Sequence, residues 1–179
     1  MSALRTTCVM CALALGNVLA GCAAIPADAP EKVVPAAPDR SPLQMLAAIE
    51  TASGRDDREL SVQPLRDPQV EDLREHAAAS IRSRDYAAAA QALNEALMIV
   101  ADEPGLLQER AEIALLQGEF ERAETLARRA FDLGSKVGPL CRRHWATIEQ
   151  ARLARGVKGD AASARVQIDA CTVAGFERM

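Results

Sequence analysis

Thiols and imidazoles are the side chains in this sequence that could do chemistry. Cysteine stands at positions 8, 11, 22, 141 and 171, beside two histidines, His76 and His144. A thiolate can act as a nucleophile or bind a metal. The sequence has no phosphate-binding glycine loop, nucleophile elbow or zinc-protease motif, and its Asp and Glu residues are scattered. We therefore expect no enzymatic activity and no cofactor, and the distinctive chemistry lies in the cysteines.

The residues up to Cys22 have the pattern of a secretory signal. Arg5 is the only charged residue among them, and an apolar run follows from Cys8 to Val18. This run is shorter than the roughly 20 residues that a membrane-spanning helix needs. A short positive region, a short apolar region and small residues are typical of a signal peptide, here residues 1–21.

The last four of these residues, Leu19-Ala20-Gly21-Cys22, resemble the lipobox of bacterial lipoproteins. The resemblance implies that the sulfur of Cys22 receives a diacylglyceryl group and that the new amino terminus is acylated, for example with palmitate. Two or more acyl chains hold a protein stably on a membrane. Ala23, rather than Asp, follows the cysteine, which by the same resemblance implies an outer-membrane anchor facing the periplasm. The alternative is an ordinary signal peptide in which Cys22 falls by chance.

Composition divides the remaining chain into a tether and one domain. Five of the nine prolines lie between residues 23 and 42, and chain rich in Pro and Ala is extended and semi-rigid. Residues 22–42 are therefore expected to be the acylated cysteine and its tether. A short helix and linker follow over 43–66, and a helical domain over 67–175. The formal charge of −4 gives no indication of nucleic-acid binding, which usually needs a strongly basic domain.

Helix signals recur along the whole domain. Ser41-Pro42 predicts a helix start and Gly54 its end, with Leu43, Leu46, Ala47 and Ile49 at helical spacing between them. Because no stretch alternates apolar and polar residues, we predict an all-α fold without a sheet. Asp85 and Asp160 are the expected N-caps of two helices. The predicted helices after residue 67 span about 68–83, 86–101, 105–117, 119–133, 139–155 and 160–173.

Similar residues recur 34 positions apart in the domain. The period and the two-helix unit resemble the tetratricopeptide repeat, which implies antiparallel hairpins stacked as a short solenoid. The repeat's usual Trp, Gly and Tyr are absent from the first helix, and a third unit, with its turn at Gly159-Asp160 and Ala164 as its small residue, fits less well. The alternative is an Ala-rich bundle with an accidental period. The matching pairs are Leu73 and Leu107, Ala77 and Ala111, Ile81 and Leu115, Tyr86 and Phe120, Ala89 and Ala123, and Ala96 and Ala130.

Two cysteines of the domain are expected to form a disulfide. Cys141 lies early in one predicted helix and Cys171 late in the next, and these two ends of an antiparallel hairpin lie side by side. Secreted proteins keep such pairs oxidised. Free buried thiols are one alternative. Another is a metal site that adds His144 to the two cysteines, although no fourth ligand is evident. His76 is expected at the surface or its boundary.

The resemblance to tetratricopeptide repeats also implies a binding groove, lined mainly by the first helix of each repeat. We expect the protein to bind a protein or peptide partner of the cell envelope there, as an adaptor or assembly factor. A structural subunit packed permanently in an envelope complex, such as a pilotin-like or secretion-related one, is the alternative, followed by an enzyme or a small-ligand binder. The residues expected to face the groove are Arg74, Ala78, Ile81, Arg82, Gln108, Glu112 and Leu115.

Overall fold

In the computed structural model, residues 40–54 and 67–172 are described, and all of them form helices or the turns between helices. All of the described residues belong to one compact unit. The all-α prediction is confirmed, because the described residues contain no strand. None of their helices is long and apolar enough to cross a membrane. The predicted signal peptide, Cys22 and its tether, and the linker over 55–66 lie outside the described residues.

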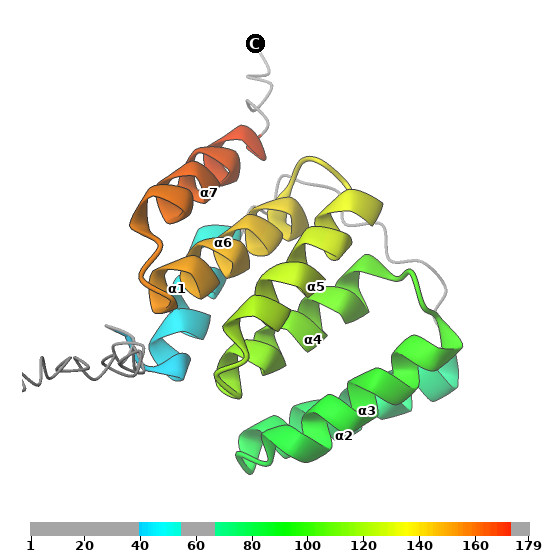
Figure 1. The fold of residues 1–179 in the computed structure, drawn as a ribbon. Coiled ribbons are helices and arrows are strands. Elements are labelled where there is room, and N and C mark those ends of the chain that lie inside the picture. The colour runs from blue at the N-terminus through cyan, green and yellow to red at the C-terminus, as the bar shows by residue number, and fades with distance from the viewer. Residues whose placement is uncertain (1–39, 55–66, 173–179) are drawn as a thin grey trace, which may run out of the picture. The chain divides into compact units, whose positions relative to one another are not determined.

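Six helices form three antiparallel hairpins, and one helix precedes them (Figure 1). Within each hairpin the two helices pack along each other, and neighbouring hairpins meet through α3 with α4 and through α5 with α6. The described chain is therefore a stack of helical hairpins. The helices are α1 (Pro42–Ser53), α2 (Pro68–Arg82), α3 (Tyr86–Ile99), α4 (Pro104–Leu116), α5 (Phe120–Leu133), α6 (Pro139–Ala154) and α7 (Lys158–Ala170).

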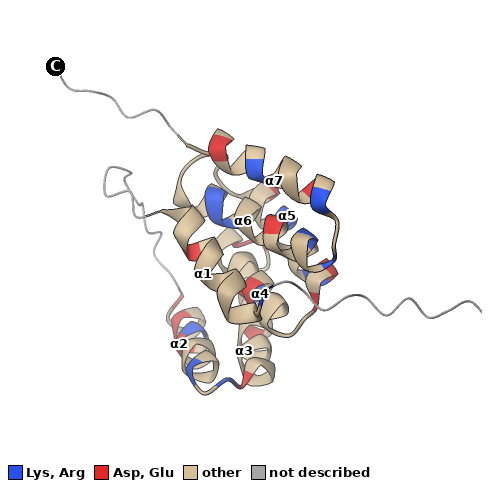
Figure 2. Cartoon of the chain, turned by 90° about the vertical axis from the view of Figure 1, so that its left-hand side faces the viewer, with Lys and Arg blue, Asp and Glu red and all other residues tan. Residues whose placement is uncertain are grey.

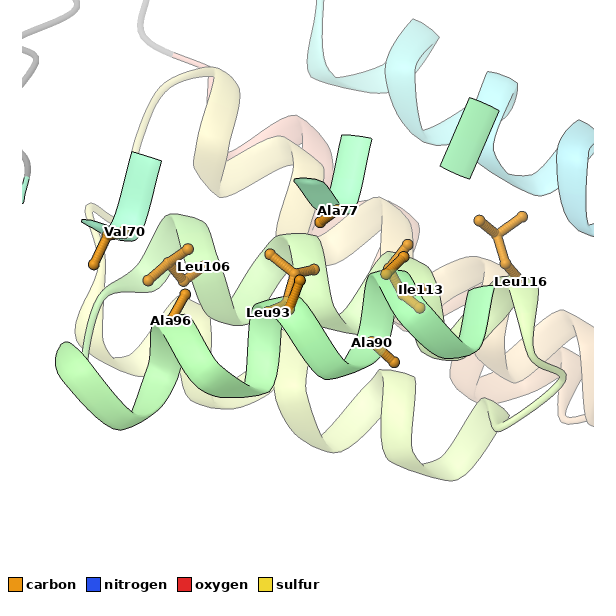
Figure 3. Packing of buried hydrophobic residues seen from close by; sticks show 10 residues of the cluster. Val70, Ala77, Ala90, Leu93, Ala96, Leu106, Ile113 and Leu116 are labelled. Atoms are coloured by element: carbon orange, nitrogen blue, oxygen red, sulfur yellow. The ribbon is translucent and has the colours of Figure 1, made fainter. Parts of the chain in front are cut away.

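The recurring alanines lie at the contacts between helices. Ala77 and Ala89 of the first hairpin, and Ala111 and Ala123 of the second, are all buried. A small side chain at these positions lets the helix axes approach, and a larger one would have no space in so dense an interior. Figure 3 shows part of this core, where Leu93 of α3 lies among side chains from α2, α3 and α4.

The three hairpins turn in the same way. Each first helix ends in a Schellman motif, in which two backbone N–H groups beyond the helix donate to carbonyl groups of its last turn. In the second hairpin, Gly118 donates to Leu115 and Glu119 donates to Ala114. The residue at the centre of the turn has a positive φ, which is 62° at Arg84, 76° at Gly118 and 78° at Gly156.

This turn corrects the register expected for the third hairpin. The sequence interpretation placed its turn at Gly159-Asp160, but the turn forms at Gly156, because Gly156 has the left-handed conformation that the motif needs. Helix α7 therefore begins at Lys158. Asp160 lies within its first turn instead of capping it, where its charge still faces the positive end of the helix dipole. The other predicted cap, Asp85, does accept a hydrogen bond from the backbone N–H of Ala88, at 2.9 Å.

A disulfide joins the two helix ends of the third hairpin that lie opposite its turn. Cys141 at the start of α6 and Cys171 at the end of α7 form a disulfide, with their Cα atoms 5.7 Å apart. The backbone N–H of Gly138 also donates to the carbonyl oxygen of Cys171, at 2.8 Å. The predicted pairing is therefore present, and the two thiols are not available for the alternative metal site. The described residues contain no group of three or more His, Cys, Asp or Glu side chains that could hold a metal ion.

Candidate protein-binding groove

The first helix lies against the first helices of the later hairpins. Helix α1 packs mainly on α6 and also touches α4 (Figure 2). Met45 and Ile49, one turn apart, are each only 1% exposed and pack in one cluster with Leu115 of α4 and Ala146 of α6. The backbone carbonyl of Ser53, in the last turn of α1, accepts a hydrogen bond from Nε of Arg142, at 2.9 Å. The chain itself therefore covers part of the face where a partner was expected.

The sequence predicts a short helix and linker over 43–66 before the helical domain over 67–175, but it does not indicate that this helix packs on α6 and α4. Leu43 belongs to the apolar residues at helical spacing, but it is 54% exposed. The buried pair is Met45 and Ile49. Ser41 caps the helix as expected: its hydroxyl accepts from the backbone N–H of Gln44, and the Gln44 side chain accepts from the backbone N–H of Ser41.

Beside α1, a groove of about 390 Å³ remains open between α2 and α4. Its apolar lining includes Leu46 from α1 and Ala78 and Ile81 from α2, and its polar lining consists of glutamates and arginines. We call this site the open groove. It is lined by Leu46, Glu71, Arg74, Glu75, Ala77, Ala78, Ile81, Leu93, Glu109, Glu112, Ile113, Leu116 and Arg143.

Four of the seven residues expected to face a partner line the open groove, namely Arg74, Ala78, Ile81 and Glu112. Arg82 is exposed at the end of α2 but is not among the lining residues. The remaining two are buried. Leu115 packs against α1 in the cluster described above, and Gln108 forms hydrogen bonds in the interior between α4 and α6. These two side chains are therefore covered by the protein's own helices.

Both arginines of the open groove are held by glutamates of α4. Arg74 forms an ion pair with Glu109 through two nitrogen atoms and a second one with Glu71, at 3.3 Å. Nη2 of Arg143 donates to Glu112 at 2.7 Å. Burial lowers the pKa of each guanidinium, but the hydrogen bond and charge of the paired glutamate outweigh it and raise the pKa overall. Both groups stay charged, and both already have anionic partners.

A chain of buried polar groups connects the charged side chains of the open groove to the core. Gln108 donates to Glu112 at 2.8 Å and to the hydroxyl of Thr147 at 2.7 Å. Its amide oxygen lies 2.7 Å from Nδ1 of His144, so Nδ1 must carry the proton, because an amide oxygen only accepts. His144 is fully buried, and its Nε2 has no hydrogen-bond partner among the residues that the structure describes. Burial, followed by the charges of Arg143 and Lys136, lowers the pKa of His144 to about 4.

The helical spacing of the glutamates is a sequence signal for the groove residues that the prediction did not include. The glutamates of the open groove lie one helical turn apart, Glu71 and Glu75 on α2 and Glu109 and Glu112 on α4, so they share a face with residues that were expected there. Leu46 and Arg143 could not be found in this way, because the packing of α1 on α6 brings them to the groove.

No family model matches this sequence and no curated protein matches it. One solved structure does match: the globular C-terminal domain of P. aeruginosa LpoP. The two share 32% sequence identity with a TM-score of 0.56, and the alignment covers 58% of this chain and 98% of that domain. At this identity and coverage, the helical part of this chain belongs to the same family as the globular C-terminal domain of LpoP.

Proposed function

We propose that this protein is a lipoprotein of the cell envelope, anchored in the outer membrane through Cys22, whose helical domain binds a protein partner in the periplasm. The observation that carries the proposal is the open groove beside α1. It combines an apolar surface, from Leu46, Ala78 and Ile81, with a charged rim, and contact surfaces between proteins commonly have this arrangement. The similarity to a domain of LpoP supports a helical domain carried by a lipoprotein.

The polar groups of the open groove favour contact with a protein over binding of an anionic small molecule. Its two arginines are engaged by glutamates, so no cationic group is left to hold a phosphate or carboxylate. No nucleophile and base converge there within hydrogen-bond distance, as covalent catalysis requires. The proposal accordingly assigns the protein neither catalysis nor a cofactor.

A second candidate function, permanent packing in an envelope complex, has its own observation. Met98 is 78% exposed, and Ile99 and Val100 next to it are partly exposed. Apolar side chains gathered on a surface often mark a contact with another protein. They lie at the end of α3, and none of the three is among the residues that line the open groove.

The test places a photocrosslinking amino acid in the living cell at one of three exposed positions: Ala78 in the open groove, Met98 at the end of α3, or Ala162 on α7. We expect crosslinking at Ala78 to one envelope protein in stoichiometric yield, and none at Ala162. A crosslinker placed at Leu46 should capture the same envelope protein. This crosslink should be lost in a chain that also carries Ala78→Arg, because the long cationic side chain fills the groove.

Three results would contradict parts of the proposal. Equal crosslinking at Ala78 and Ala162 would exclude a specific groove, and crosslinking at Met98 alone would favour the permanent-subunit candidate. The anchor is tested by membrane fractionation: the Cys22→Ala chain should leave the membrane fraction. A Cys22→Ala chain that still sediments with membranes would exclude lipidation as the anchor.

A further inference from the structure

We propose that the partner places a helix in the open groove, that this helix carries Lys or Arg beside an apolar face, and that it lies alongside α1. This inference rests on the function proposed above and specifies the chemistry of the partner. Three observations carry it: the way α1 binds the neighbouring surface, the charges of the groove lining, and the position of Leu46.

Helix α1 shows what kind of segment this face of the domain accepts. It is a single helix that inserts Met45 and Ile49, at positions i and i+4, between side chains of α4 and α6. The open groove is the adjoining region, bounded by α2 and α4, and its apolar lining again consists of helix side chains such as Ala78, Ile81 and Ile113. A second amphipathic helix can therefore bind as α1 does, through anchor residues one turn apart.

The charge of the lining selects a basic helix over an acidic one. The open groove is lined by four glutamates and two arginines, so carboxylates exceed guanidinium groups by two. Both arginines already pair with glutamates of α4. Glu75 is exposed and takes part in no ion pair or hydrogen bond within the described part of the chain. Complementary charges favour a partner that brings cations to this rim and disfavour one that brings carboxylates.

Leu46 would be the contact shared by α1 and the incoming helix. It is half-buried, packs against the core cluster of α2, α3 and α4 as well as against the cluster that contains Met45, and lines the open groove. Leu43, one turn earlier on α1, does not line the groove. Helix α1 is therefore one wall of the partner's site, and the two leucines form a matched pair for a test.

The experiment measures the binding of two fluorescent peptides by anisotropy. Each is a capped amphipathic helix with apolar residues at i, i+3, i+4 and i+7; one carries Lys on both flanks, and the other has Glu at every Lys position. The full chain, extracted from membranes, is held in phosphatidylcholine nanodiscs, and empty discs give the background. We expect the Lys peptide to bind at least about tenfold more tightly than the Glu peptide.

Four variants assign the binding to the open groove. Glu75→Lys should weaken binding of the Lys peptide by about fivefold, as expected for one partly exposed charge pair, whereas Asp169→Lys on α7, with the same change in net charge, should leave it unchanged. Leu46→Ala should weaken the binding of both peptides, whereas Leu43→Ala should change the binding of neither.

Other outcomes would overturn the inference without touching the proposed function. If a partner crosslinks at Ala78 but the two peptides bind equally, or Glu75→Lys has no effect, the groove binds something other than a basic helix. If the chain alone forms dimers that Ala78→Arg disrupts, the occupant of the groove is a second copy of this chain.

Discussion

His144 is buried, uncharged at neutral pH and bonded through one ring nitrogen, so its protonation is coupled to unfolding. Its pKa in the folded protein is about 4, whereas an unfolded histidine titrates near 6.5. Between these two values the unfolded chain binds the proton and the folded chain does not. The free energy of unfolding therefore falls as the pH is lowered from about 6.5 to 4, by up to about 3 kcal/mol from this residue alone.

Urea unfolding at pH 7.0 and pH 4.5 measures this loss of stability. Carboxylates also titrate in this range, so the decisive quantity is the difference between the native chain and His144→Gln, which should lose less stability on acidification. His76→Gln, at an exposed position on α2, is the control and should behave like the native chain. Equal losses in all three proteins would show that His144 does not remain neutral in the fold.

At the scale of single elements, the docking of α1 rests on two side chains. Met45 and Ile49 are fully enclosed by α4 and α6, and truncating a large buried side chain usually costs about 2–4 kcal/mol. We expect Met45→Ala and Ile49→Ala each to lower the free energy of unfolding by such an amount in urea. Leu43→Ala on the exposed face of the same helix should change it by less than about 0.5 kcal/mol. Equal, small effects at all three positions would mean that α1 is not docked.

Substitution by alanine should change the stability in opposite directions at two glycines, one in a hairpin turn and one in a helix. Gly118 has a φ of 76° at the centre of a turn, and Gly159 lies inside α7; neither would bring a new Cβ within 4 Å of another atom. Gly118→Ala should therefore lower stability by about 1 kcal/mol through backbone strain. Gly159→Ala should raise it by about 0.5–1 kcal/mol, because alanine favours the helix. Thermal unfolding of both variants checks the two signs, and destabilisation by Gly159→Ala would contradict the assigned helix start.

Sequence periodicity predicted the bounds of the helices better than it predicted which helices contact each other. The helix ends fall within a few residues of expectation, since capping residues and glycines are local signals. The docking of α1 is not local: an amphipathic helix shows that one face will be buried but not which helices will bury it. The same limit explains Leu115 and Gln108, which lie at groove positions of their repeat but are covered by α1 or bonded to α6. The third turn was misplaced because two glycines, Gly156 and Gly159, stand close together.

Across the whole domain, the disulfide makes the last hairpin differ from the other two. It closes a loop with a sequence separation of 30 residues, and such a link stabilises a fold by roughly 3–4 kcal/mol in the chain-entropy model. Reducing this disulfide should lower the free energy of unfolding by about that amount. Replacing both cysteines, as Cys141→Ser with Cys171→Ser, should have the same effect. Hydrogen exchange should accelerate first in α7, whose main contacts are with α6. Acceleration that begins in α3 instead would contradict a local role for the bond.

The same bond also changes what proteolysis can do to this molecule. From Cys141 to Cys171 the backbone and the disulfide form one covalent ring that contains most of α6 and all of α7. Lys158 is exposed at the start of α7, where trypsin can cut. Such a cut adds one water and opens the ring but releases no fragment, so the two pieces stay covalently joined until the disulfide is reduced. The other two hairpins contain no cysteine, and a cut in either of their turns divides the chain outright.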